Sequence, residues 1–555
     1  MADKADSVKR IVICLLWIGV ILVSIKSILT DTGYDNGYQI AMSYRHIKGD
    51  SMFATMWEPH QTSTFVVDIL MWLYQRIVPS FVGVNLFLQV CGTLLFGLLC
   101  VPVYRTLKPY CNDTTAQFIC MFLVVYRAKQ TPFVEFANMQ VFFSVLVFLC
   151  LIKYFENCST KRYLYLAAFF LCLEILSYPS CIIAYLFVVG LLYVYGGRKL
   201  GDIVRFSFCC GILGAIYLGI IVAKNGFNTV LQNILGMLSF DSHSAGKLNS
   251  GIWVNTKECV IYIGWLVTAA LIGFFVFKIF RLISGRRVSY LVTFAIVIFI
   301  SEVILILTCK SALFHKSIYI LPILLISIGF VLINNLSENE KRVFVTGVCL
   351  AVASLIAVML LTDLSIDTFL PYMVVGCMVS IMAISKLQKE GALFTVFIIL
   401  TVLFHRGVVV NGYMNVAHCE NVFQMENIIR NGPNLGIVAD LGNVLMNRDA
   451  GPELEALTKD DDCVLVATYD WIIDPSIFLF INGKIANPSV IDTPVYNANL
   501  LDYYSRYPQK KPTVVALFCP YGYDGFLQDS WILNWTEDNY KLFYIGNYWK
   551  IYRQN

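Results

Sequence analysis

Charged side chains are scarce in this sequence, and their scarcity sets the class of protein. Asp, Glu, Lys and Arg make up 14% of the 555 residues, against about 25% in an ordinary soluble domain, whereas hydrophobic residues make up 58%. A soluble chain with this composition has too few polar groups to cover its surface, so the excess must face lipid. The net charge of +4 is small and the basic residues lie in short clusters, which gives no indication of a nucleic-acid partner.

Several short motifs of other enzyme classes are also missing. The sequence has no phosphate-cradling GxxxxGK[ST] loop and no HExxH zinc helix. Most of its 18 cysteines lie in apolar runs, where they act as small hydrophobes, and no CxxC pair has metal-ligand spacing. Cys419, Cys463 and Cys519 fall in the region expected outside the membrane, and three cysteines cannot all pair with one another. The disulfide state and the redox compartment therefore stay open.

Long apolar runs dominate the first 404 residues. A helix needs about 20 mostly apolar residues to span the hydrocarbon of a bilayer. By that measure the sequence predicts about thirteen spans, at 11–30, 84–103, 114–126, 138–152, 163–178, 180–197, 203–223, 259–277, 289–308, 317–334, 343–361, 368–385 and 391–404. The predicted fold class is a polytopic α-helical membrane protein. Two polar segments, 31–83 and 224–258, are predicted outward loops, each containing an amphipathic helix parallel to the membrane.

The distribution of basic residues predicts the orientation. With the N-terminus in the cytoplasm, the inside segments hold eighteen Lys and Arg residues, and the outside loops between spans hold ten over about twice the length. An odd number of spans then puts the region from residue 405 outside. We expect an integral, multi-pass protein of a plasma (inner) membrane, of bacterial type, with the first loop and the C-terminal region extracytoplasmic.

The C-terminal region has the pattern of a small α/β domain. Cys463–Ala467 and Thr513–Phe518 are predicted buried strands, Tyr540–Tyr552 a closing hairpin and Glu453–Leu457 part of a helix between strands. About 150 residues are enough for an independent domain. The predicted organisation is thus a membrane domain at 1–404 and an extracytoplasmic α/β domain at 405–555.

The first outward loop concentrates the residues suited to chemistry. It contains Tyr34-Asp35-Asn36-Gly37-Tyr38, then Lys48-Gly49-Asp50, then Met56-Trp57-Glu58-Pro59-His60. Taken alone, an acidic residue just beyond a span is more often a solvated loop charge. The combination resembles the first external loop of lipid-linked-sugar glycosyltransferases of fold type C, in particular the protein O-mannosyltransferase and aminoarabinose-transferase group. The resemblance covers the topology of the whole chain, and its sequence-specific part is residues 34–65.

This resemblance implies roles for individual residues. It implies that Asp35 is the catalytic base, but Asn36 stands where the family has a second acidic residue. In an inverting transfer, a carboxylate takes the proton of the acceptor hydroxyl while that oxygen attacks the anomeric carbon. Glu58 is the second catalytic candidate, as a group that orients the acceptor or the donor sugar. Weaker candidates for substrate or metal contact are His60, Glu135, Tyr38 and Trp57.

Cations near the outer ends of spans are candidates for binding the donor. The leaving group implied by the resemblance is a polyprenyl phosphate, whose negative charge needs cationic stabilisation. The candidate ligands are Arg127 and Lys129, before the fourth span, and His315, Lys316 and Tyr319, in a segment similar to the basic-Tyr-Leu-Pro step of the same enzymes. Snorkelling cations that anchor a span would occupy the same positions. No cofactor is certain, and a divalent metal ion stays open without an assigned ligand set.

The leading hypothesis is a membrane glycosyltransferase of the hexosyl- or pentosyltransferase class. It would move a sugar from a polyprenyl-phosphate carrier to a glycan, lipid or protein acceptor outside the cytoplasm. One alternative is a transporter or flippase of a lipid-linked glycan, which is expected to show an internal repeat and broken helices. The other is a glycan polymerase or ligase, whose main loop is expected late in the span order. The sequence shows no evident repeat, and its polar motif follows the first span.

Overall fold

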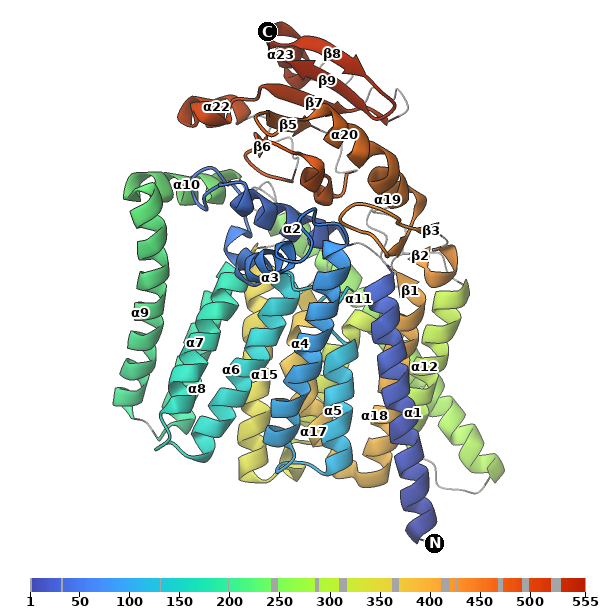
Figure 1. The fold of residues 1–555 in the computed structure, drawn as a ribbon. Helices are drawn as coiled ribbons and strands as arrows, with labels where there is room; N and C mark the ends of the chain where they lie inside the picture. The colour runs from blue at the N-terminus through green and yellow to red at the C-terminus, as the bar shows by residue number, and fades with distance from the viewer. Residues whose placement is uncertain are drawn as a thin grey trace.

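The protein is a bundle of long helices with a small sheet above one end (Figure 1). The computed structural model describes residues 2–30, 33–129, 131–197, 199–240, 248–284, 289–308, 317–361, 369–410, 420–425, 427–467, 473–491, 499–520 and 531–554. The N-terminus lies at the end of the bundle away from the sheet (Figure 1). We call the two ends of the bundle the sheet end and the opposite end.

Within the described ranges, a helix overlaps every predicted span. These helices are α1 (Ala2–Leu29), α4 (Val84–Leu107), α5 (Asp113–Val125), α6 (Phe136–Glu156), α7 (Arg162–Ser177), α8 (Ile182–Tyr195), α9 (Leu200–Asn225), α11 (Leu248–Ser284), α12 (Tyr290–Thr308), α14 (Leu321–Val331), α15 (Glu338–Leu361), α17 (Val374–Ile384) and α18 (Gln388–Val408). Eight described stretches are long and apolar enough to cross a membrane, and one of them, Leu370–Val408, contains both α17 and α18. The predicted fold class, a polytopic helical membrane protein, is confirmed.

The burial of the helices separates the centre of the bundle from its lipid-facing rim. In α6, 83% of the most apolar stretch is buried within the protein, compared with 11% in α9. Large apolar side chains of α9 are correspondingly exposed, among them Leu200 and Phe208 at 67% and Ile220 at 65%. In water such a surface would be strongly unfavourable, so α9 must be surrounded by lipid.

Both predicted interfacial helices are present. They are α3 (Phe65–Gln75) and α10 (Phe227–Phe240), and α10 lies across the end of α9 at the sheet end (Figure 1). Gly226, with a φ of 82°, allows the chain to turn between α9 and α10. Helix α11 begins at Leu248, within the predicted outward segment 224–258, although its apolar, membrane-spanning stretch starts only at Val260. Polar residues exclude a segment from the hydrocarbon, but they do not stop a helix from continuing into water.

The C-terminal region forms a five-stranded mixed sheet with the order β6-β5-β7-β9-β8. Strands β6 (Lys484–Ile485), β5 (Cys463–Ala467) and β7 (Val514–Phe518) are parallel, and β9 (Trp549–Arg553) runs antiparallel to β7 and β8 (Lys541–Ile545). Both predicted strands, the predicted hairpin and the predicted helix, α20 (Gly451–Leu457), are thus present. Helices α22 (Leu500–Arg506) and α23 (Trp531–Asn539) flank the sheet.

Short elements join the sheet to the bundle. They are the strand pair β1 (Val409–Val410) and β2 (Glu420–Asn421), the pair β3 (Asn427–Ile428) and β4 (Val438–Ala439), helix α19 (Leu441–Leu445) and the 3-10 helix η9 (Pro475–Phe480). Helix α18 continues to Val408, beyond the boundary predicted at residue 404. Buried residues of the sheet, such as Val464 and Trp549, belong to the same hydrophobic cluster as the bundle. The C-terminal region therefore packs as an extension of the membrane part.

Candidate functional site

The site begins where α1 ends and the chain turns into α2 (Tyr34–Ile47). Gly33 has a φ of 62° and provides the turn before the helix. Asp35 lies in the first turn of α2, where the helix dipole favours a carboxylate. Its Oδ2 is 2.8 Å from Nζ of Lys129, and the two side chains are 23% and 29% exposed. The predicted base and one predicted phosphate ligand therefore form a direct, partly accessible ion pair.

Aromatic rings frame this ion pair. The ring of His60 stacks on Phe136 with centroids 4.1 Å apart and an interplanar angle of 3°, and Tyr178 lies 5.2 Å from His60. The ammonium of Lys129 is 5.8 Å from the centroid of Phe136. The hydroxyl of the buried Tyr38 accepts a hydrogen bond from the backbone N–H of His60 at 3.5 Å. His60 and Tyr38 thus belong to the wall beside Asp35, and their contact with substrate or metal stays a prediction.

Glu135 supports the loop that carries Lys129. Its carboxylate caps α6 by accepting hydrogen bonds from the backbone N–H groups of Ala137 (2.6 Å) and Asn138 (2.8 Å). Burial raises the pKa of Glu135 to about 7, although Lys129 acts in the opposite direction. The cap accounts for both carboxylate oxygens, so the structure gives Glu135 a role in shaping the loop.

Asn36, which departs from the family pattern, is part of a network of amide side chains that ends on Asp474. Its Oδ1 accepts a hydrogen bond from Thr131 Oγ1 (3.1 Å), and its Nδ2 donates to Asn85 Oδ1 (3.5 Å). Asn85 donates in turn to Asn434 (2.7 Å), and Asn434 donates to Asp474 (3.3 Å). A carboxylate at position 36 could not donate to Asn85. The amide therefore connects α2 to α4 and to the C-terminal region.

Glu58 is fully buried, with 0% of its side chain exposed. Its carboxylate accepts hydrogen bonds from Arg45 Nη1 (3.0 Å), Ser489 Oγ (2.6 Å) and Val490 N (2.7 Å). Burial raises the pKa of Glu58, while Arg45 and the hydrogen bonds act in the opposite direction. In this structure three protein donors hold the buried carboxylate, which gives Glu58 a structural role, and its predicted catalytic role stays a prediction.

Trp57 lies in the same contact between the first loop and the C-terminal region. Its ring packs edge-on against Tyr503 with centroids 5.1 Å apart, and its backbone N–H donates to Pro488 O at 2.9 Å. The buried ion pairs beside it comprise Arg45–Asp50, Arg45–Glu58 and Lys510–Asp50. We call Arg45, Asp50, Glu58 and Lys510 the loop charge cluster. Trp57 and this cluster hold the loop in place, and contact of Trp57 with substrate stays a prediction.

Arg127 lies on the same loop as Lys129 but is buried beside Arg406, in the last turn of α18. Arg406 Nη2 donates to Arg127 O at 3.0 Å, and Arg127 Nε donates to Val124 O at 2.7 Å. In the part of the chain that the structure describes, Arg127 Nη1 and Arg406 Nε and Nη1 have no hydrogen-bond partner. Burial and the charge of Arg406 lower the pKa of Arg127. Two adjacent buried guanidinium groups with free N–H donors indicate a place for an anion.

Tyr319 lies beside this arginine pair. It lies in the 3-10 helix η3 (Ser317–Ile320), and the guanidinium carbon of Arg406 is 5.5 Å from its ring centroid. The buried hydroxyl of Tyr126 has no partner among the described residues. His315 and Lys316, predicted together with Tyr319, lie outside the described residues, as does Cys419.

Arg406 is not among the phosphate ligands predicted from the sequence. It stands at the end of the last span, where a basic residue is ordinarily a membrane anchor. The available signal was His405-Arg406 at a predicted outer end, but only the fold shows that Arg127 is its neighbour.

A metal site is not assigned by the structure. Throughout the ranges described above, no group of three or more His, Cys, Asp or Glu side chains could hold a metal ion. The divalent cation left open by the sequence stays a prediction, and no step below depends on it.

Comparisons with known proteins give similarity at the level of structure. No family model and no curated protein matches the sequence. One similar solved structure is the archaeal oligosaccharyltransferase AglB from Archaeoglobus fulgidus in complex with an inhibitory peptide and a dolichol-phosphate (TM-score 0.42, 12% identity, 92% of this chain and 69% of that chain). Another is ArnT from Cupriavidus metallidurans bound to undecaprenyl phosphate (TM-score 0.38, 12% identity, 100% of this chain and 98% of that chain).

Proposed function

We propose that the protein is a membrane glycosyltransferase that moves a sugar from a polyprenyl-phosphate carrier to an extracytoplasmic acceptor. One observation carries the proposal: a single loop between α5 and α6 places Lys129 against Asp35 and Arg127 beside Arg406. A partly exposed carboxylate and a buried cationic pair therefore share the sheet end of the bundle. Transfer from an anionic lipid carrier needs both, a base for the acceptor and positive charge for the leaving group.

Asp35 acts as the general base in this proposal. The acceptor hydroxyl gives its proton to the carboxylate while its oxygen forms a bond to the anomeric carbon of the sugar. The bond between that carbon and the phosphate oxygen of the carrier breaks, and its electron pair leaves with the phosphate. Attack from the face opposite the leaving group inverts the anomeric configuration. Lys129, 2.8 Å from Asp35, holds the carboxylate at the first turn of α2.

Arg127 and Arg406 receive the carrier phosphate. Their free N–H groups supply charge-assisted hydrogen bonds to the oxygens that gain negative charge as the glycosidic bond breaks. Tyr319 lies beside Arg406 and completes the polar lining of this place. His315 and Lys316 stay proposed ligands of the same phosphate. In this assignment Lys129 positions the carboxylate of Asp35. The polyprenyl chain of the carrier lies along the apolar helices.

The test is sugar transfer by the purified protein in detergent, with a panel of polyprenyl-phosphate sugars as donors. Asp35→Asn keeps the shape of the side chain but removes the base, so transfer should fall about 10²- to 10⁴-fold. Asp502→Asn is the matched control, because Asp502 is a partly exposed acid of α22 that pairs with Arg506. Undiminished transfer by Asp35→Asn would refute the base assignment. Movement of a lipid-linked glycan without any transfer would instead favour a transporter or flippase.

A further inference from the structure

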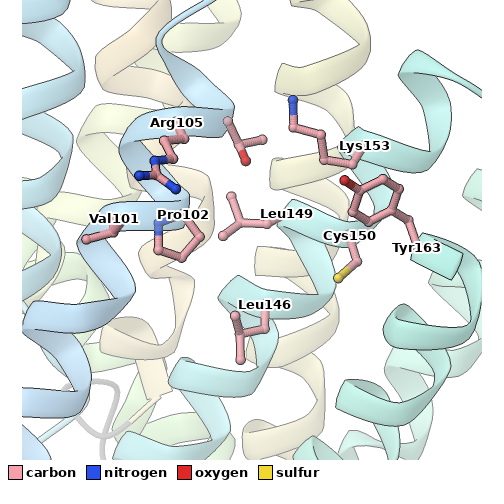
Figure 2. Close-up of a pocket in the computed structure, with 9 residues that line it drawn as sticks. Val101, Pro102, Arg105, Leu146, Leu149, Cys150, Lys153 and Tyr163 are labelled. Atoms are coloured by element: carbon pink, nitrogen blue, oxygen red, sulfur yellow. The ribbon is translucent and has the colours of Figure 1, made fainter.

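A cavity opens at the opposite end of the bundle, between α4, α6 and the start of α7 (Figure 2). Its volume is about 320 Å³, and its lining consists of Val101, Pro102, Arg105, Thr106, Leu146, Leu149, Cys150, Lys153 and Tyr163. Figure 2 shows Arg105 and Pro102 on one side, and Lys153 and Tyr163 on the other. The cavity does not include any residue of the proposed transfer site.

The lining changes from polar to apolar along the helices. Arg105 lies in the last turn of α4, Lys153 near the end of α6 and Tyr163 in the first turn of α7. The apolar lining residues Val101 and Leu149 lie about one turn earlier in α4 and α6, closer to the middle of the bundle. The cavity therefore has a cationic mouth at the end of the bundle and an apolar wall inside it.

The positive charge at the mouth is only partly neutralised. Lys153 pairs with Glu156 at 2.8 Å, but no ion pair of the described residues includes Arg105. Arg162 Nη2 donates to the hydroxyl of Tyr163 at 3.0 Å, which leaves the O–H of Tyr163 as a donor. One unpaired guanidinium, one ammonium and one hydroxyl can thus face the same ligand, and the chemistry that satisfies them is an anion.

We propose that this cavity binds one anionic phospholipid. Its headgroup phosphate lies between Arg105, Lys153 and Tyr163, and one acyl chain covers the apolar wall at Leu146 and Leu149. A free phosphate satisfies the mouth but leaves the apolar wall uncovered. A zwitterionic lipid covers the wall but brings its own cation to the mouth. Basic pockets between transmembrane helices bind the headgroups of anionic lipids in other membrane proteins.

The experiment measures lipid binding to the full-length protein in detergent by native mass spectrometry, with phosphatidylglycerol and phosphatidylcholine as probes. Phosphatidylglycerol should bind more tightly, and Arg105→Gln should weaken it about fivefold because one cation near a headgroup is removed. Lys108→Gln is the control. It removes a cation at the same end of the bundle that pairs with Asp113 at 3.2 Å and does not line the cavity, so binding should stay within about twofold of the parent.

A second variant tests the apolar wall. Leu149→Trp fills the inner part of the cavity and should reduce phosphatidylglycerol binding without changing the mouth. Equal binding of the two lipids, or equal effects of Arg105→Gln and Lys108→Gln, would overturn the proposal. So would inorganic phosphate that displaces the lipid as effectively as phosphatidylglycerol itself, since the site would then recognise a free anion.

Discussion

Replacing Glu58 should show whether this residue stabilises the first loop or takes part in the reaction. The carboxylate accepts hydrogen bonds from Arg45, Ser489 and Val490, all at 3.0 Å or less. Glu58→Ala removes all three and leaves the buried Arg45 with Asp50 as its carboxylate partner. Removing one partner of a buried ion pair costs about 3–5 kcal/mol. Glu58→Gln keeps the shape and an acceptor for the Val490 N–H, so it should cost about 1–3 kcal/mol.

The measurements are thermal unfolding of the purified variants in detergent and the transfer assay described above. Glu58→Ala should melt well below the parent and Glu58→Gln between the two. Glu338→Ala should melt like the parent, because Glu338 is 87% exposed and its ion pair is with Lys341, three residues further along the same helix. Folded Glu58→Gln should transfer sugar within about tenfold of the parent, since a structural carboxylate does not enter the 10²- to 10⁴-fold contribution of a general base. A Glu58→Gln protein that melts like the parent but loses transfer as completely as Asp35→Asn would contradict this reasoning.

Further predictions concern the two halves of the site and the pH dependence of stability. Arg406→Gln should raise KM for the lipid donor about tenfold or more, measured from initial rates, because it removes charge-assisted donors; an unchanged KM would exclude the arginine pair as the phosphate site. Lys129→Met should lower kcat with little change in that KM, and the reverse pattern would make Lys129 a phosphate ligand. Burial raises the pKa of Asp474 to about 6, so the folded state binds a proton more tightly than the unfolded state; its contribution to stability is full below the unfolded value of 3.8 and is lost as the pH rises through about 6. Asp474→Asn should therefore become more stable relative to the parent as the pH rises from 4 to 7. A difference in melting temperature between the two proteins that stays constant over this range would contradict the raised pKa of Asp474.

The membrane helices could be predicted from the sequence because long apolar runs are stable only in the hydrocarbon of a bilayer. The ends of these helices could not be predicted in the same way. Helix α11 begins at Leu248, before the apolar stretch starts, because helical hydrogen bonding and burial in lipid are separate requirements. The strands at 463–467 and 514–518 were predictable for a similar reason, since short runs of β-branched residues between polar segments match a buried parallel sheet.

The site was predictable only where its signal is local. Asp35 stands in a contiguous motif, and the structure places it beside Lys129. The role of Glu58 depends on Ser489 and Val490, which lie 431 and 432 residues further along the chain. Arg406 is separated from Arg127 by 279 residues. Partners at these separations leave no pattern in one sequence, so the sequence could not show that Glu58 is bonded to the C-terminal region.

The contact between Glu58 and the C-terminal region also sets an order of assembly. The first loop is synthesised well before Ser489 and Val490, which follow Glu58 by 431 and 432 residues. Contacts this distant along the chain form late, because long loops must close first. Asp35 and Arg45 share α2, so the turn that carries the proposed base reaches its final position only when the last region docks. A chain whose translation stops before residue 489 would therefore insert its helices into the membrane while the first loop still lacks the partners of Glu58.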